Sequence, residues 1–145
     1  NYFINLINMS FENDFVKLTF NKETLRVHVL IKKELPKKNE EFEDFLTYFD
    51  NFYQACDKIN QKIILFYDLR ELGMLKYEQY NKWTELFKKN EQISIKYLIC
   101  SSILCSSSII TNVINTLLLF YKNTKPVKIF TSEEDAIDFI NEQLK

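Results

Sequence analysis

The stretch that decides the fold is Lys62-Ile63-Ile64-Leu65-Phe66-Tyr67-Asp68-Leu69-Arg70, in which five apolar or aromatic residues lead up to one carboxylate. A short, unbroken apolar run is typical of a strand that is buried on both faces. Ligands and partners meet open α/β sheets at the carboxyl ends of parallel strands. Asp68 and the residues from 69 to 75 are therefore the first place to look for a functional site.

The composition indicates one globular domain. The chain has 145 residues, of which 46% are hydrophobic and 15% aromatic, and a domain of this length buries roughly 70% of the surface of its unfolded chain. The formal net charge of -1 gives no overall positive field to hold nucleic acid or an anionic membrane. Only one glycine and two prolines occur, which argues against a glycine-rich phosphate loop, a long linker or a turn-dense β-sandwich.

The cysteines and the single histidine indicate no metal chemistry. Cys56, Cys100 and Cys105 are an odd set, and we expect buried free thiols in a reduced compartment rather than disulfides. His28 lies far from the Cys100 and Cys105 pair in sequence, so we expect neither a metal nor a cofactor. The chain shows no signal-peptide pattern, and no apolar run reaches the roughly 18 residues that span a bilayer. These features predict a cytoplasmic protein without a transmembrane segment.

Alternating apolar residues predict strands in the N-terminal part of the chain. Residues 2–8 alternate weakly and predict an edge strand or an ordered arm within residues 1–14. Residues 15–20 and 25–32 alternate strictly around a turn at 21–24, which predicts an antiparallel hairpin. The inward side chains of this hairpin would be Val16, Leu18, Phe20, Leu25, Val27, Val29 and Ile31.

Helical and strand patterns then alternate to the end of the chain. Residues 40–59 place aromatic residues at helical spacing, which predicts a long helix. Gly73 is expected to be a turn or positive-φ position. A second helix should follow it and end at Lys88-Lys89-Asn90. Residues 95–101 and 127–130 predict strands. A third helix should run from Ser106–Ser108 to about residue 122. The closing helix should begin at the N-cap Ser132 and dock Ala136, Ile137, Ile140 and Leu144.

We therefore expect one mixed α/β domain over residues 15–145, with an antiparallel hairpin followed by parallel strands that alternate with about four helices. The order of elements resembles a STAS domain, the module named for sulfate transporters and anti-sigma-factor antagonists. In particular, the run Phe130-Thr131-Ser132-Glu133-Glu134-Asp135-Ala136 is similar to the closing strand-to-helix turn of that family. The resemblance covers the chain from about Phe15 and implies parallel later strands, with the helices mainly on one face of the sheet.

The serine switch of the antagonists in that family has no counterpart in this chain. Those members carry Asp-Ser-Ser-Gly or a close variant after the central strand, and a partner kinase phosphorylates the serine at the helix start. Asp68 matches the acid by position, but the chain continues Leu69-Arg70-Glu71-Leu72-Gly73-Met74, with no Ser or Thr before Trp83. What the resemblance leaves is a docking surface where the loop after Asp68 approaches the loop around Ser101 to Ser108.

The favoured function is a non-enzymatic protein-interaction or regulatory module. Asp68, Arg70, Met74 and Tyr77 would contact the partner, because Arg, Met and aromatic residues are enriched at interfaces. An enzyme is less favoured, because Asp68 as a general base lacks a visible partner acid.

The alternative function is the binding of a small anion or a lipid by the loops after the central strands. The helix start at Ser106, Ser107 and Ser108 would hold an anionic head group. The apolar residues beside it would be Leu72, Met74 and Leu75.

Leu119 and Phe120 interrupt the polar side of the third predicted helix. Two neighbouring apolar residues on such a face suggest a contact with a second copy, giving a weak homodimer, or with another partner. Single exposed apolar residues are also common without any partner. The sequence leaves both interpretations open.

Overall fold

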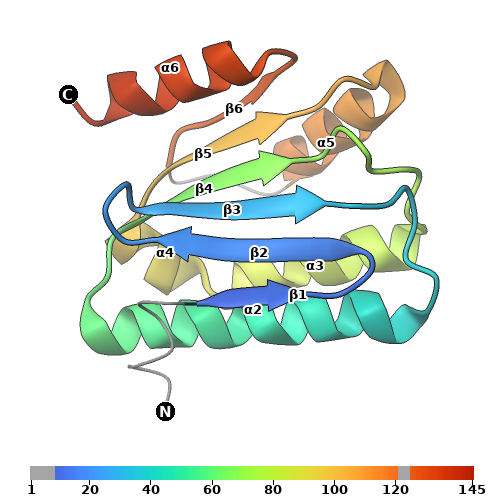
Figure 1. Ribbon diagram of the computed structural model, residues 1–145, viewed down its shortest axis with the longest axis horizontal. Coiled ribbons are helices and arrows are strands. Elements are labelled where there is room, and N and C mark those ends of the chain that lie inside the picture. The colour runs from blue at the N-terminus through green and yellow to red at the C-terminus, as the bar shows by residue number, and fades with distance from the viewer. Residues whose placement is uncertain (1–8, 121–124) are drawn as a thin grey trace.

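The computed structural model describes residues 9–120 and 125–145, and its centre is one six-stranded sheet (Figure 1). The strands are β1 (Ser10–Glu12), β2 (Val16–Asn21), β3 (Arg26–Ile31), β4 (Ile63–Asp68), β5 (Leu98–Leu104) and β6 (Val127–Phe130). The helices are α2 (Asn39–Ile59), α3 (Tyr77–Lys89), α4 (Glu91–Tyr97), α5 (Ser108–Phe120) and α6 (Glu133–Gln143). The arm or strand predicted at residues 2–8 lies outside the described residues.

The six strands lie side by side in the order in which they occur in the chain. β1, β2 and β3 pair antiparallel, and β3, β4, β5 and β6 pair parallel. This arrangement confirms the predicted mixed α/β sheet, with a hairpin before the parallel strands. β4 lies between β3 and β5, where Tyr67 pairs with Val29 on one side and with Ile103 on the other.

Alternate residues of β4 enter two different cores, because successive side chains of a strand point to opposite faces. Ile63, Leu65 and Tyr67 belong to the large core, which includes the buried faces of α2, α3 and α5. Ile64 and Phe66 belong to a smaller core, which α6 closes with Ala136 and Ile140. Crossovers between parallel strands are right-handed. Because each new parallel strand is added on the same side of the previous strand, all the crossover helices lie on one face of the sheet. Among the described elements, only α6, which follows the last strand and packs beside β5, covers the other face (Figure 1).

The long helix α2 forms where the sequence predicts it, because its apolar residues recur every three or four positions. The buried side chains of α2 are Phe42, Phe45, Leu46, Phe49, Phe52, Tyr53, Ala55 and Cys56. The helix ends at Asn60, whose backbone is left-handed (φ 55°, ψ 46°) and whose N–H donates to the carbonyl oxygen of Cys56. Asparagine tolerates this conformation better than most residues other than glycine.

The strand predicted at residues 95–101 begins later than expected. Residues 91–97 form the short helix α4, and β5 starts at Leu98. Short apolar runs fit a helix or a strand equally well, and here Tyr97 decides between them. Its side chain is buried, and its hydroxyl lies 2.7 Å from Oδ1 of Asn60 at the end of α2. This contact anchors the last turn of α4.

Gly73 was predicted to be a turn or positive-φ position, and its φ is not positive. Gly73 is required for another reason. Its N–H donates to the carbonyl oxygen of Glu34 at 2.6 Å, and a Cβ atom on Gly73 would lie 2.3 Å from Cγ of Glu34. The left-handed residue of the hairpin turn is Leu25 instead (φ 63°), so Leu25 is part of the turn and packs against the smaller core.

The closing helix confirms its predicted start but not all of its predicted contacts. Ser132 is the N-cap, and its hydroxyl oxygen accepts the N–H of Asp135 at 3.3 Å. Ala136 and Ile140 are buried as expected. Leu144, also expected to dock, is instead exposed at the C-cap.

Candidate binding surface and cavity

The loops that follow β3, β4 and β5 are tied together at the carboxyl end of the parallel strands. The N–H of Leu69 donates to the carbonyl oxygen of Leu104 at 2.8 Å, which joins the loop after β4 to the end of β5. The bond from Gly73 to Glu34 joins the same loop to the segment after β3. These bonds fix the backbone of residues 69–76 over the end of the sheet.

Asp68 and Arg70 form a two-pronged ion pair within this loop. Nε of Arg70 donates to Oδ1 of Asp68 at 3.0 Å, and Nη2 donates to Oδ2 at 2.7 Å. Burial alone would raise the pKa of Asp68, but the hydrogen bonds and the charge of Arg70 outweigh burial and hold that pKa below its usual value. Asp68 is therefore an anion with a partner at neutral pH, and not a base with a pKa near 7.

Four large apolar side chains project from the connections around this edge, and we call them the edge surface: Leu35, Met74, Tyr77 and Ile109. Tyr77 is 82% exposed, the largest value among these four, and Met74 is 54% exposed. Leu35 precedes α2, Met74 and Tyr77 lie at the entrance of α3, and Ile109 lies in the first turn of α5. The structure thus exposes two of the predicted contact residues, Met74 and Tyr77, beside the ion pair formed by the other two.

The serines predicted to hold an anion have different roles. Ser107 caps α5, because its hydroxyl oxygen accepts the N–H of Ile110 at 3.3 Å. Ser106 and Ser108 are exposed. Ser101 was wrongly placed in the loop: it lies within β5 and is buried. The loop that approaches Asp68 begins only after Leu104.

The apolar residues predicted beside those serines divide between core and surface. Leu72 and Leu75 are buried, and only Met74 is exposed. The first turn of α5 contains no acidic residue, so nothing in that turn repels an anion.

His28 lies on the outer side of β3, as its position in the alternation predicts. Its ring stacks on Phe66 of the neighbouring strand, with 4.9 Å between centroids. Burial lowers the pKa of His28, and the nearby charge of Arg26 lowers it further. Glu133 and Asp68 act in the opposite direction without reversing the shift. The imidazole is therefore neutral at pH 7.

The three thiols are free and buried, as predicted. Burial raises the pKa of Cys56 to about 12 and that of Cys100 to about 11. Thiols with such values form little thiolate at neutral pH and are poor nucleophiles.

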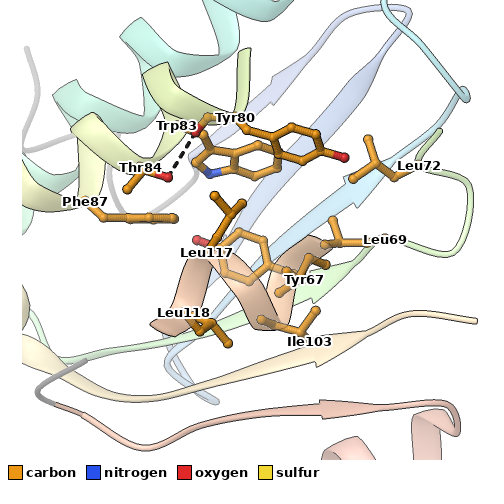
Figure 2. A pocket seen from close by; sticks show the side chains of 11 residues that line it. Tyr67, Leu69, Leu72, Tyr80, Trp83, Thr84, Phe87, Ile103, Leu117 and Leu118 are labelled. Atoms are coloured by element: carbon orange, nitrogen blue, oxygen red, sulfur yellow. Dashed lines mark hydrogen bonds between the residues drawn. The ribbon is translucent and has the colours of Figure 1, made fainter. Parts of the chain in front are cut away.

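A cavity of about 100 Å³ lies between α3, α5 and the strands β4 and β5 (Figure 2). The side chains that line it are Tyr67, Leu69, Leu72, Tyr80, Trp83, Thr84, Phe87, Ile103, Ile114, Leu117 and Leu118. The sequence predicts a helix here, and it gives no sign of a hollow beside that helix. A second cavity of about 80 Å³ shares Tyr67, Phe87, Ile103 and Leu118 with the first.

Trp83 contributes a polar atom to this apolar cavity. The residue is only 8% exposed, and its Nε1 has no hydrogen-bond partner among residues 9–120 and 125–145. The indole ring is held edge-on by Phe45, with 5.3 Å between centroids, and by Tyr67 at 6.1 Å. In Figure 2 the nitrogen lies on the side of the ring toward Thr84 and Leu117.

The side chains of Leu119 and Phe120, predicted to mediate association, lie outside the described part of the structure. No group of three or more His, Cys, Asp or Glu residues that could hold a metal ion occurs among the described residues. Within the same residues, no helix combines the length and the apolar character needed to cross a membrane.

Comparisons of the chain with family models, with curated proteins and with solved structures give no match.

Proposed function

We propose that this protein is a non-enzymatic, STAS-like interaction or regulatory module that binds a partner protein through the edge surface. The observation that carries the proposal is the exposure of Met74, in the loop after β4, and of Tyr77, the first residue of α3. Hydrogen bonds join this loop to the neighbouring segments. Because the backbone of the loop is already ordered, binding does not carry the entropy cost of ordering it. Met and Tyr are also enriched at protein interfaces.

The ion pair of Asp68 and Arg70 supports the same proposal. A partner that covers the edge surface would not bury an unpaired charge there, because the carboxylate and the guanidinium already satisfy each other. We therefore expect a partner that places an apolar pocket over Tyr77 and Met74, with polar groups around its rim. The absence of Ser and Thr between Asp68 and Trp83 supports binding without a phosphorylation switch in this loop.

The experiment compares three forms of the protein as bait in extracts of the native cell: the wild type, a Met74→Ala, Tyr77→Ala variant and an Ile95→Ala control. Ile95 is also an exposed apolar residue, but it lies on α4. Each protein that the wild type retains is then purified, and its Kd for the three forms is measured. We expect at least tenfold weaker binding by the double variant, about 1.4 kcal/mol, and no change for the control. Equal affinities for all three forms would overturn the proposal.

A small anion or lipid head group at Ser106–Ser108 is a second candidate function. It is supported by the absence of acidic residues from the first turn of α5, since the N-terminus of a helix attracts anions. Titration with inorganic phosphate tests it. The amide signals of residues 107–110 should shift in a saturable way in nuclear magnetic resonance spectra, and a shift that merely follows ionic strength would count against it.

A further inference from the structure

We infer that the cavity between α3 and α5 binds a compact, uncharged, mainly apolar molecule with one hydrogen-bond acceptor, which receives the N–H of Trp83. This site is separate from the edge surface and does not depend on the function proposed for it. The inference rests on the shape and lining of the cavity together with one unpaired donor.

The lining defines the chemical class of the ligand. None of the described residues that line the cavity is charged, and an unpaired ion placed among such side chains would lose its hydration without compensation. The volume of about 100 Å³ is somewhat below the roughly 150 Å³ of an apolar cavity that accepts benzene. A single six-membered ring or a short branched chain therefore has the right order of size.

The unpaired donor defines the position of the acceptor. Buried N–H groups almost always have a partner, and leaving one without a partner is unfavourable. Thr84 does not supply that partner: its hydroxyl donates to the carbonyl oxygen of Tyr80 at 3.0 Å, and its oxygen does not accept the indole N–H. A ligand carbonyl, ether or hydroxyl oxygen near Trp83 would satisfy the indole.

The packing of α5 offers a route into the cavity. Leu117 and Leu118 line the cavity and are only half-buried. The cavity is already partly open to solvent, so a ligand would enter beside these two leucines.

A single water molecule is the competing occupant. A buried water usually needs two to four polar partners, and the lining is dominated by apolar side chains. The lining also contains the hydroxyl groups of Tyr67, Tyr80 and Thr84. The hydroxyl of Tyr80, like the indole of Trp83, is buried without a hydrogen-bond partner among the described residues. The experiment must therefore distinguish a ligand site from a hydrated or empty packing defect.

Trp83 is the only tryptophan in the chain, so its indole N–H gives one unambiguous signal in proton–nitrogen correlation spectra. We would titrate the whole protein with cyclohexanone, cyclohexane and cyclohexanecarboxylate, which share a ring but differ in acceptor and charge. We expect a saturable shift of the indole signal with cyclohexanone, about fivefold weaker binding of cyclohexane because it forms no hydrogen bond, and no binding of the carboxylate. No saturable shift with cyclohexanone, or equal affinity for the ketone and the alkane, would overturn the inference.

Three variants complete the experiment, with binding followed through the methyl signals of the lining leucine and isoleucine residues. Trp83→Phe keeps an aromatic ring but removes the donor, and it should abolish the preference for the ketone over the alkane. Leu117→Phe fills the cavity while retaining the indole, and it should abolish the binding of both. Tyr97→Phe alters a buried hydroxyl that lines neither cavity, and it should bind as the wild type does. If Trp83→Phe fails to fold, Leu117→Phe tests the site alone. Loss of ketone binding by that variant supports the inference, and unchanged ketone binding would show that the ligand binds elsewhere.

Discussion

Asp68 is the last residue of the central strand, and its carboxylate is already paired with Arg70. The two hydrogen bonds from Arg70 keep the carboxylate ionised and orient the guanidinium along the loop. Arg70 is thus unlike the free arginines that often anchor interfaces. At the level of single residues, we expect the proposed recognition to depend mainly on Met74 and Tyr77, whose side chains are exposed.

His28 should make the stability of the protein sensitive to mild acid. Its pKa is lowered in the folded state, whereas an unfolded histidine titrates near 6.5. Protonation therefore favours the unfolded state, so stability should fall as the pH drops below about 6.5. The groups that face His28 are Arg26, Asp68 and Glu133.

The variant His28→Gln tests this expectation. It should lose less stability than the wild type between pH 7 and the lowered pKa of His28, because it lacks the titrating group. The free energy of unfolding in urea, measured at several pH values, gives the two slopes. The absolute stability of the variant is not the criterion, since the substitution also removes the stacking on Phe66. Parallel slopes would contradict the prediction.

At the level of elements, the junction of α3 and α4 depends on one buried amide. Asn90 accepts a hydrogen bond from Nε2 of Gln54 and donates to Oδ1 of Asp50, each at 2.9 Å, and it also donates to the carbonyl oxygen of Leu86 at 3.0 Å. The side chain is fully buried. It thus joins α2 to the end of α3.

Replacing Asn90 with alanine should lower the free energy of unfolding by about 1–3 kcal/mol, because several polar groups lose their buried partner. The control is Asn51→Ala, which makes the same chemical change at an exposed position of α2 and should alter stability by no more than about 0.5 kcal/mol. Urea unfolding measures both. Equal effects of the two substitutions would show that the amide of Asn90 has no special role.

The loop between β4 and α3 depends on the missing side chain of Gly73. In Gly73→Ala, the new Cβ would lie 2.3 Å from Cγ of Glu34 and 2.9 Å from its carbonyl oxygen. We expect a loss of stability of about 1–3 kcal/mol from this overpacking. Adding Glu34→Ala should restore only part of the loss, because it removes Cγ but leaves the carbonyl oxygen. Full restoration in the double-mutant cycle would show that the backbone contact is unimportant.

The sequence predicts well those elements in which the spacing of apolar residues shows which side of the element is buried. The alternation of β2 and β3, the apolar run of β4 and the aromatic spacing of α2 each specify one conformation. The short helix α4 was missed, because Ile93 and Ile95 fit a strand as well as a helix. The reason for Gly73 was also missed, since it depends on Glu34, which is distant in sequence. The cavity was beyond prediction, because residues from four elements and the loop after β4 form it together.

At the level of the whole molecule, association through α5 remains a proposal. Two apolar side chains buried at a contact would contribute about 1.5–3 kcal/mol each before the costs of association. Leu119 and Phe120 could therefore support a weak homodimer but not a tight one. We expect the sedimentation of the wild type to depend on concentration in the high micromolar range, and that of Leu119→Lys to remain monomeric.

The control for this measurement is Thr116→Lys, which adds the same charge at an exposed position of the same helix and should associate as the wild type does. A constant monomer mass for all three proteins would contradict the prediction. Loss of association in both variants would instead indicate a general charge effect.

The order of the strands has a consequence for how the chain reaches its fold. Since β1 to β6 are neighbours in space in the same order as along the chain, each strand can pair as soon as the next one has been synthesised. No strand has to wait for a distant partner, and no later segment has to be inserted between two strands that have already paired. Pairings that are closer in sequence require less loop-closure entropy, and chains dominated by them fold faster. The sheet can thus be assembled progressively from β1 toward β6, with α6 completing the second face last.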